Sequence, residues 1–248
     1  MVTATFRFYE ELNAFLAPGR RGHEFACLCA RAATTKHMIE ALGVPHTEVE
    51  LVLVNGESVD FGHLLQEGDR LAVYPKFEAF DITPLLRVRE RSLRSVRFVA
   101  DAHLGGLARL LRLTGYDTLY DNHFGDAQIE VLALEQGRIV LTRDRELLKC
   151  RSITHGCYVH ALRAEQQLLE VFRRLDLARA ARPFTRCLSC NAPLQPVEKA
   201  RVTALLPPSV RERHQRFSLC PGCGRVFWEG SHWRRMREFV DKLLATVS

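Results

Sequence analysis

The chain has 248 residues, of which 47% are hydrophobic and 26% are charged, a composition typical of folded globular domains and not of disordered or fibrous chains. This length is enough for two or three small domains, each with its own core. The first residues lack an unbroken apolar stretch, and no segment approaches the roughly 18 apolar residues of a membrane span. We therefore expect a cytoplasmic protein without a membrane partner.

Charge is distributed unevenly along the sequence, whose formal net charge is +6. The first 80 residues contain 7 Lys and Arg against 11 Asp and Glu, whereas residues 181–248 contain 12 against 5. A basic C-terminal part favours a polyanionic partner, of which nucleic acid is the commonest. A solvated basic surface is the alternative.

Residues 1–80 show the order strand, strand, helix, strand, strand. The predicted strands are Val2–Tyr9, Glu24–Ala30, Val49–Val54 and Arg70–Tyr74. This order resembles a β-grasp, ubiquitin-like domain, in particular the sulfur-carrier branch of that fold. Such carriers use a terminal Gly-Gly, whereas here the chain continues past Tyr74. We therefore expect a binding or scaffolding role, with a protein partner, for this domain.

A basic linker is predicted at residues 81–95. It contains Pro84 and the arginines Arg87, Arg89, Arg91 and Arg94. Such a run is either a solvated face or a contact to a phosphate backbone.

Residues 96–180 alternate between strand and helix patterns. The predicted strands are Val96–Ala100, Tyr116–Tyr120, Arg138–Thr142 and Cys157–His160. Helices are expected after the first two strands and again at about Ala164–Leu175. Alternation at this spacing predicts a parallel sheet with helices on its faces.

Acidic residues follow three of these strands: Asp101, Asp121 and Asp144. Asp126 opens the second predicted helix. Because chemistry in open α/β sheets collects at the carboxyl ends of the strands, these carboxylates are candidate ligands of Mg²⁺ or Mn²⁺. Such a cation could orient a water and stabilise charge on a phosphodiester.

Several of these residues also have a purely structural interpretation. Asp126 suits a helix N-cap, and Asp121 suits a turn. Arg109, Arg112 and Arg143 are candidate substrate-binding residues, although Arg109 and Arg112 could equally form the solvated side of their helix.

Two strings, RFVADAHLGGLARLLRLTGYDTLY (97–120) and GRIVLTRDRELL (137–148), resemble the Mut-seven C-terminal RNase family, a compact branch of the PIN-domain nucleases. The resemblance covers roughly 96–237, and a ubiquitin-like extension also occurs in such proteins. The resemblance implies a PIN-like fold and an activity that hydrolyses RNA phosphodiester bonds with the help of a metal ion. The family's acidic positions correspond to Asp101, Asp126 and Asp144, with Asp121 in place of a fourth acid.

Two Cys-x-x-Cys pairs lie in the last domain, residues 181–248, and predict a structural zinc site formed by Cys187, Cys190, Cys220 and Cys223. A redox-active dithiol is the alternative for either pair alone. The 29 residues between the pairs leave room for an insertion in which Pro207-Pro208 is expected to prevent a regular helix. The other four cysteines are interpreted as small buried apolar residues: Cys27, Cys29, Cys150 and Cys157.

The sequence thus predicts an α/β multidomain protein with a β-grasp domain, a PIN-like domain and a zinc ribbon. The predicted activity is that of a metal-dependent ribonuclease, with a non-catalytic RNA-binding or scaffolding protein as the alternative. A phosphatase of the haloacid dehalogenase type is excluded, because it needs Asp-x-Asp where this chain has Asp101-Ala102-His103.

Overall fold

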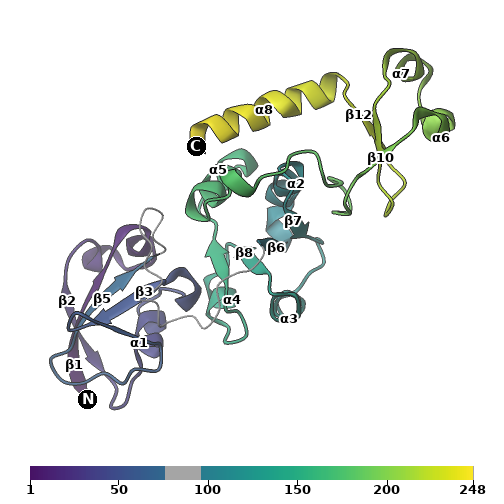
Figure 1. Ribbon diagram of the computed structural model, residues 1–248. Coiled ribbons are helices and arrows are strands. Elements are labelled where there is room, and N and C mark those ends of the chain that lie inside the picture. Colours follow the sequence, from purple (N-terminus) through teal and green to yellow (C-terminus); the bar gives the residue numbers. More distant parts are fainter. Residues whose placement is uncertain (76–95, 248) are drawn as a thin grey trace. The chain divides into compact units, whose positions relative to one another are not determined.

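The computed structural model describes residues 1–75 and 96–247 (Figure 1). The chain divides into two compact units: Met1–Ser95 with Phe124–Val159, and Val96–His123 with His160–Ser248. The arginine-rich linker predicted at 81–95 lies outside the described residues. No described helix is long and apolar enough to cross a lipid bilayer.

The N-terminal residues form a five-stranded sheet with the order β2-β1-β5-β3-β4. Its strands are β1 (Val2–Phe8), β2 (Phe25–Cys29), β3 (Leu51–Val54), β4 (Glu57–Val59) and β5 (Arg70–Tyr74). The first and last strands pair in parallel, and the other pairs are antiparallel. This is the β-grasp arrangement predicted from the sequence, with β4 as an additional strand that was not predicted.

One helix, α1 (Thr35–Ala41), packs its buried side chains, including Ile39, into the β-grasp core. Thr34 caps this helix, since its side chain accepts a hydrogen bond from the His37 backbone N–H at 3.2 Å. Three 3₁₀ helices were not predicted: η1 (Glu10–Phe15), η2 (Pro18–Arg20) and η3 (His46–Glu48).

The central sheet contains four strands in the order β7-β6-β8-β9. They are β6 (Arg97–Ala100), β7 (Asp117–Leu119), β8 (Ile139–Thr142) and β9 (Gly156–Tyr158), with β6 parallel to β7 and β8 parallel to β9. The accompanying helices are η5 (Ala102–Leu104), α2 (Gly105–Leu113), α3 (Asp126–Gln136), α4 (Arg145–Lys149), α5 (Ala164–Arg174) and η6 (Ala178–Ala180). The predicted parallel α/β sheet is therefore confirmed.

The C-terminal strands form a three-stranded antiparallel sheet of β10 (Gln195–Val197), β11 (Phe217–Leu219) and β12 (Val226–Trp228). The insertion between the cysteine pairs contains α6 (Lys199–Val202), η7 (Thr203–Leu205) and α7 (Pro208–Arg213), and the chain ends in α8 (Ser231–Val247). The expectation that the two prolines prevent a helix is wrong. Pro208 occupies the first position of α7, where the missing N–H would have had no helical partner.

The β-grasp domain contacts residues 148–158 of its own unit through η3. The Glu48 Oε1 atom accepts a hydrogen bond from the Tyr158 backbone N–H at 2.5 Å, and His46 Nε2 lies 3.0 Å from the carbonyl oxygen of Ile153. All three side chains of η3 are buried. Because β9 is the last strand of its sheet, Glu48 satisfies a backbone donor that an edge strand would otherwise leave unpaired.

This contact predicts a stability effect of Glu48→Ala. The substitution removes the acceptor of a partly buried N–H group, so we expect the free energy of unfolding to fall by about 1–3 kcal/mol in a urea titration. The exposed Glu57 on β4 provides the matched control, and Glu57→Ala should change it by less than about 0.5 kcal/mol. Equal stability of the two variants would show that Glu48 does not stabilise the edge of the sheet.

Candidate metal centre and acidic site

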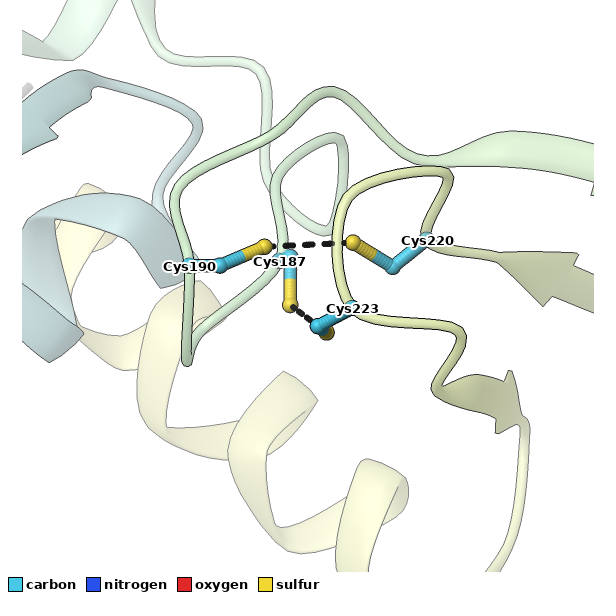
Figure 2. A group of neighbouring side chains, drawn as sticks. All are labelled: Cys187, Cys190, Cys220 and Cys223. Carbon is cyan, nitrogen blue, oxygen red and sulfur yellow. Dashed lines mark hydrogen bonds between the residues drawn. The ribbon is translucent and has the colours of Figure 1, made fainter.

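The four predicted zinc ligands lie together in the structure (Figure 2). Their sulfur atoms lie within 4.8 Å of one another, with 3.6 Å between Cys187 and Cys223 and 3.3 Å between Cys190 and Cys220. A tetrahedral ion with Zn–S bonds of ~2.3 Å would separate its sulfurs by ~3.8 Å, whereas a disulfide needs ~2.05 Å. The spacing therefore fits a shared metal ion and not a pair of disulfides.

The two cysteine turns have the same backbone geometry. In the first turn, the Cys187 N–H donates to the Ala192 carbonyl, and the Asn191 N–H donates to the Cys187 carbonyl, both at 2.9 Å. In the second turn, the Cys220 N–H donates to the Arg225 carbonyl, and the Gly224 N–H donates to the Cys220 carbonyl, also at 2.9 Å. Asn191 and Gly224 occupy the same position in the two turns and have φ angles of 69° and 70°. This left-handed conformation suits glycine and asparagine, so the sequence at both turns allows the chain to fold back around a metal.

Burial raises the pKa of the Cys187 thiol. Since thiolates and not thiols bind metals, a cation at the centre would supply the charge that favours deprotonation. All four positions of a tetrahedron are filled by sulfur, so a bound ion would have no site for water and would have a structural role.

Arg112 connects this cluster to the central domain. Its Nε donates to the carbonyl of Thr118 at 2.9 Å, and its Nη1 donates to the carbonyls of Leu188 and Ser189 at 3.2 and 2.9 Å. Only 5% of the residue is exposed, and burial lowers its pKa. A guanidinium buried in this way does not present itself to a phosphate, so the expected substrate-binding role of Arg112 is not supported.

Asn191 forms a second connection between the first cysteine turn and β7. Its side-chain oxygen accepts from the Thr118 N–H at 3.0 Å, and its amide donates to Asp117 at 2.8 Å. Arg186 lies 3.6 Å from the same carboxylate. Asn191 and Arg112 thus link the turn to β7 by hydrogen bonds that do not involve the cysteine sulfurs.

Asp101 follows β6 directly and is partly buried. It occupies the cap position of η5, but its side chain makes no capping hydrogen bond. The Tyr120 hydroxyl donates to the carbonyl of Ala102 at 3.0 Å, which links the segment after β6 to the end of β7. A Cβ atom on Gly105 would lie 2.6 Å from the Tyr120 ring, so the first glycine of the GG pair is needed for this approach.

Asp121 is exposed and closes a local turn. Its Oδ1 accepts from the His123 N–H at 2.9 Å and lies 3.0 Å from His123 Nδ1. These interactions, led by the backbone hydrogen bond, lower the pKa of Asp121. The turn interpretation of this residue is therefore supported, while its proposed role as a fourth acid remains a prediction.

Asp126 and Asp144 occupy helix starts in the other unit. Asp126 is the first residue of α3, after the cap residue Gly125, so it is not the N-cap that its position suggested. Asp144 does cap α4, because its Oδ1 accepts from the N–H groups of Glu146 and Leu147 at 2.8 and 3.4 Å. Among the described residues, no hydrogen bond involves Asp144 Oδ2, which leaves this oxygen for a ligand.

The sequence model described as "Mut7-C RNAse domain" matches residues 96–240, and the one described as "Mut7-C ubiquitin" matches residues 1–81. The chain belongs to the Mut7-C RNAse family. No curated protein matches it.

Among solved structures, two crystal structures of small archaeal modifier protein 1 from Haloferax volcanii are similar to this Mut7-C RNAse protein. They are 21% and 20% identical, and the matches cover 31% and 32% of this chain and 100% and 99% of theirs. The TM-scores are 0.26 and 0.25.

Glu130 is an acidic residue that the sequence analysis did not select. It lies one turn after Asp126 on α3, and its carboxylate accepts from the Ser152 hydroxyl at 2.5 Å. Burial raises the pKa of the nearby Cys150 thiol, and the charges of Glu130, Asp126 and Asp144 raise it further. Glu130 therefore joins Asp126 as an acidic residue on α3. The four-residue spacing of Asp126 and Glu130 was the sequence signal that could have identified it.

The remaining predicted residues have varied environments. Arg109 is exposed on α2, and Arg143 is partly buried between β8 and Asp144. Among the cysteines expected to be buried, Cys29 and Cys157 are buried, whereas Cys27 and Cys150 are partly exposed.

The Arg112 network predicts a difference between two substitutions on α2. Lysine is a compact donor that cannot reproduce a guanidinium bound to three carbonyls, so Arg112→Lys should lower the free energy of unfolding by about 1–3 kcal/mol in a urea titration. The exposed Arg109 is the control, and Arg109→Lys should change it by less than about 0.5 kcal/mol. An Arg112→Lys variant of wild-type stability would contradict the assigned role.

Proposed function

We propose that this protein is a metal-dependent ribonuclease that hydrolyses phosphodiester bonds of RNA. The observation that carries the proposal is the match to the RNAse domain across residues 96–240, which contain every candidate acid. The basic charge of the C-terminal part fits an RNA substrate.

In this proposal Asp101, Asp126 and Asp144 bind Mg²⁺ or Mn²⁺. Asp101 directly follows β6, and Asp144 lies two residues after β8, positions at the carboxyl ends of strands where chemistry in α/β proteins is usually found. Asp126 and Asp144 both lie at the start of a helix, α3 and α4, in the same compact unit. Asp121 and Glu130 are the two candidates for a fourth acid.

The cation, when bound, would activate a water and stabilise the charge that develops on the phosphate. The protein's own residues would supply ligands and position the substrate. Asp144 can bind a cation through Oδ2 while its Oδ1 holds the start of α4, which would fix the orientation of the carboxylate. Arg109 and Arg143 are the remaining candidates for contacts with phosphates.

Zinc is the metal that we propose for the four cysteines, because sulfur ligands in a closed tetrahedral set are typical of structural zinc sites. A protein partner for the ubiquitin-like domain is also proposed, on the basis of its fold.

A non-catalytic RNA-binding protein is the second candidate. It is favoured by the local structural use of two acids, since Asp121 closes a turn and Asp144 caps a helix. A protein that had lost catalysis would keep both residues for these reasons. Cleavage assays separate the two functions.

The zinc assignment predicts about one zinc ion per chain in elemental analysis of protein purified under reducing conditions. Cys220→Ser should lose the ion and lower the unfolding temperature, because metal binding contributes to the folding energy of the ribbon. Cys27→Ser, in the β-grasp domain, should keep the zinc content of the wild type. Reduced protein that is folded but free of zinc would refute the assignment.

The catalytic assignment predicts that Asp144→Asn reduces cleavage of a short RNA by roughly 100-fold or more, because a neutral amide is a poor ligand for a hard cation. The fold should survive, since asparagine caps helices about as well as aspartate. Asp176→Asn is the control, because Asp176 is exposed and has a φ of 46° that asparagine tolerates. Metal-dependent cleavage by Asp144→Asn at the wild-type rate would exclude this site.

A further inference from the structure

A cavity of about 760 Å³ lies in the C-terminal unit, between residues 183–188, the ribbon strands and the first turns of α8. This volume is within the ~300–1,000 Å³ range of ligand sites. Five aromatic side chains line it: Phe184, Phe217, Phe227, Trp228 and Trp233. The cavity does not include any of the candidate acids or the four cysteines.

Two of these aromatics already have a structural role. Phe217 is buried in the small ribbon core with Val202 and Leu206, and Trp228 packs against that cluster. Phe184 and Trp233, by contrast, are outside this core and only partly buried. Their ring centroids are 5.0 Å apart with a tilt of 36°, and both side chains line the cavity.

The backbone holds Phe184 in an unusual conformation. Its φ of 62° lies in the left-handed region, which is costly for a bulky side chain. The last carbonyls of α2 fix this geometry, because Leu113 accepts from the Phe184 N–H and Thr114 accepts from the Arg182 N–H, both at 2.9 Å. Strain that the surroundings maintain in this way is typical of ligand sites.

Charge indicates the class of ligand. Three arginines line the cavity (Arg186, Arg216 and Arg237), against one glutamate, Glu229. Arg186 is paired with Asp117, whereas Arg216 is exposed. Arg237 pairs with Asp241 at 3.1 Å but is half exposed, and its guanidinium lies 5.8 Å from the Trp233 ring centroid. Aromatic faces beside exposed arginines match an unpaired base and its flanking phosphates.

We propose that this cavity binds one unpaired base of an RNA strand, which stacks on Trp233 and Phe184 while Arg216 and Arg237 contact the adjacent phosphates. The site would recognise single-stranded RNA through stacking, which every base can provide, and would therefore select strandedness more than sequence. The inference rests on RNA as the substrate of the proposed nuclease, but not on the identity of its catalytic residues.

The test measures binding of a fluorescent single-stranded RNA to the full-length protein carrying Asp144→Asn, by anisotropy. Adding Trp233→Ala should weaken binding roughly tenfold or more, and Trp233→Phe should largely retain it because a smaller ring still stacks. Zinc content and the unfolding temperature of each variant show whether it is folded. Duplex RNA of the same length should bind equally well to all of these proteins.

A pair of charge variants tests the phosphate contacts even if Trp233→Ala fails to fold. Arg237→Gln removes a charge that lines the cavity, and Arg235→Gln removes an exposed charge from the same helix outside the lining. We expect a larger loss of single-strand affinity for Arg237→Gln. Equal losses for the two arginine variants, together with wild-type affinity of any folded Trp233 variant, would overturn the proposal.

This outcome is separate from that of the nuclease assay. Metal-dependent cleavage with binding that is insensitive to Trp233 and Arg237 would reject the cavity and keep the enzyme. Binding that depends on both residues without any cleavage by the unmodified protein would keep the cavity and reject the enzyme.

Discussion

The buried guanidinium of Arg112 is the interaction on which the C-terminal unit depends. One side chain bonds the middle residue of β7 and two carbonyls of the first cysteine turn, so it joins a helix, a strand and a loop of the cysteine cluster. Burying a cation is costly unless opposite charge compensates it. Here Cys187, Cys190 and Asp117 act on Arg112 and favour its charged form. A divalent ion bound by four thiolates would keep net negative charge, and Arg112 would partly balance that charge.

The ubiquitin-like domain has a comparable structural function in the other unit. Besides the Glu48 contact, Arg145 donates to the carbonyl of Phe15 at 3.3 Å, and its guanidinium lies 5.1 Å from the Phe15 ring and 5.5 Å from the Tyr158 ring. Arg145 is the residue after Asp144. A β-grasp residue therefore contacts the side chain that follows a candidate metal ligand, within the same compact unit.

Local signals explain which parts could be predicted from the sequence. The cysteine turns, the capped helix α1 and the strands of both sheets follow from spacing and apolar patterns that act over a few residues. Arg112 was misinterpreted because arginine was assigned to the solvated side of α2. Arg112 lies four residues after the buried Ala108, on the same side of the helix as the apolar residues. Its position therefore indicated burial, whereas its residue type indicated exposure to solvent. Contacts such as Glu48 with Tyr158 join residues 110 positions apart and leave no local pattern.

The two sequence strings that resemble the family contain residues that order the backbone as well as the candidate catalytic acids. In VADAHLGG, the absence of a side chain on Gly105 allows the Tyr120 ring to approach, and the Tyr120 hydroxyl then bonds Ala102, next to Asp101. In LTRD, the Thr142 hydroxyl accepts from the Asp144 N–H at 2.9 Å while Asp144 caps α4. The backbone beside each acid is thus held by neighbours that are not themselves acidic, and the Asp144 carboxylate is also held by the N–H groups that it caps. A carboxylate ordered in this way would lose less conformational entropy on binding a cation than a freely rotating one.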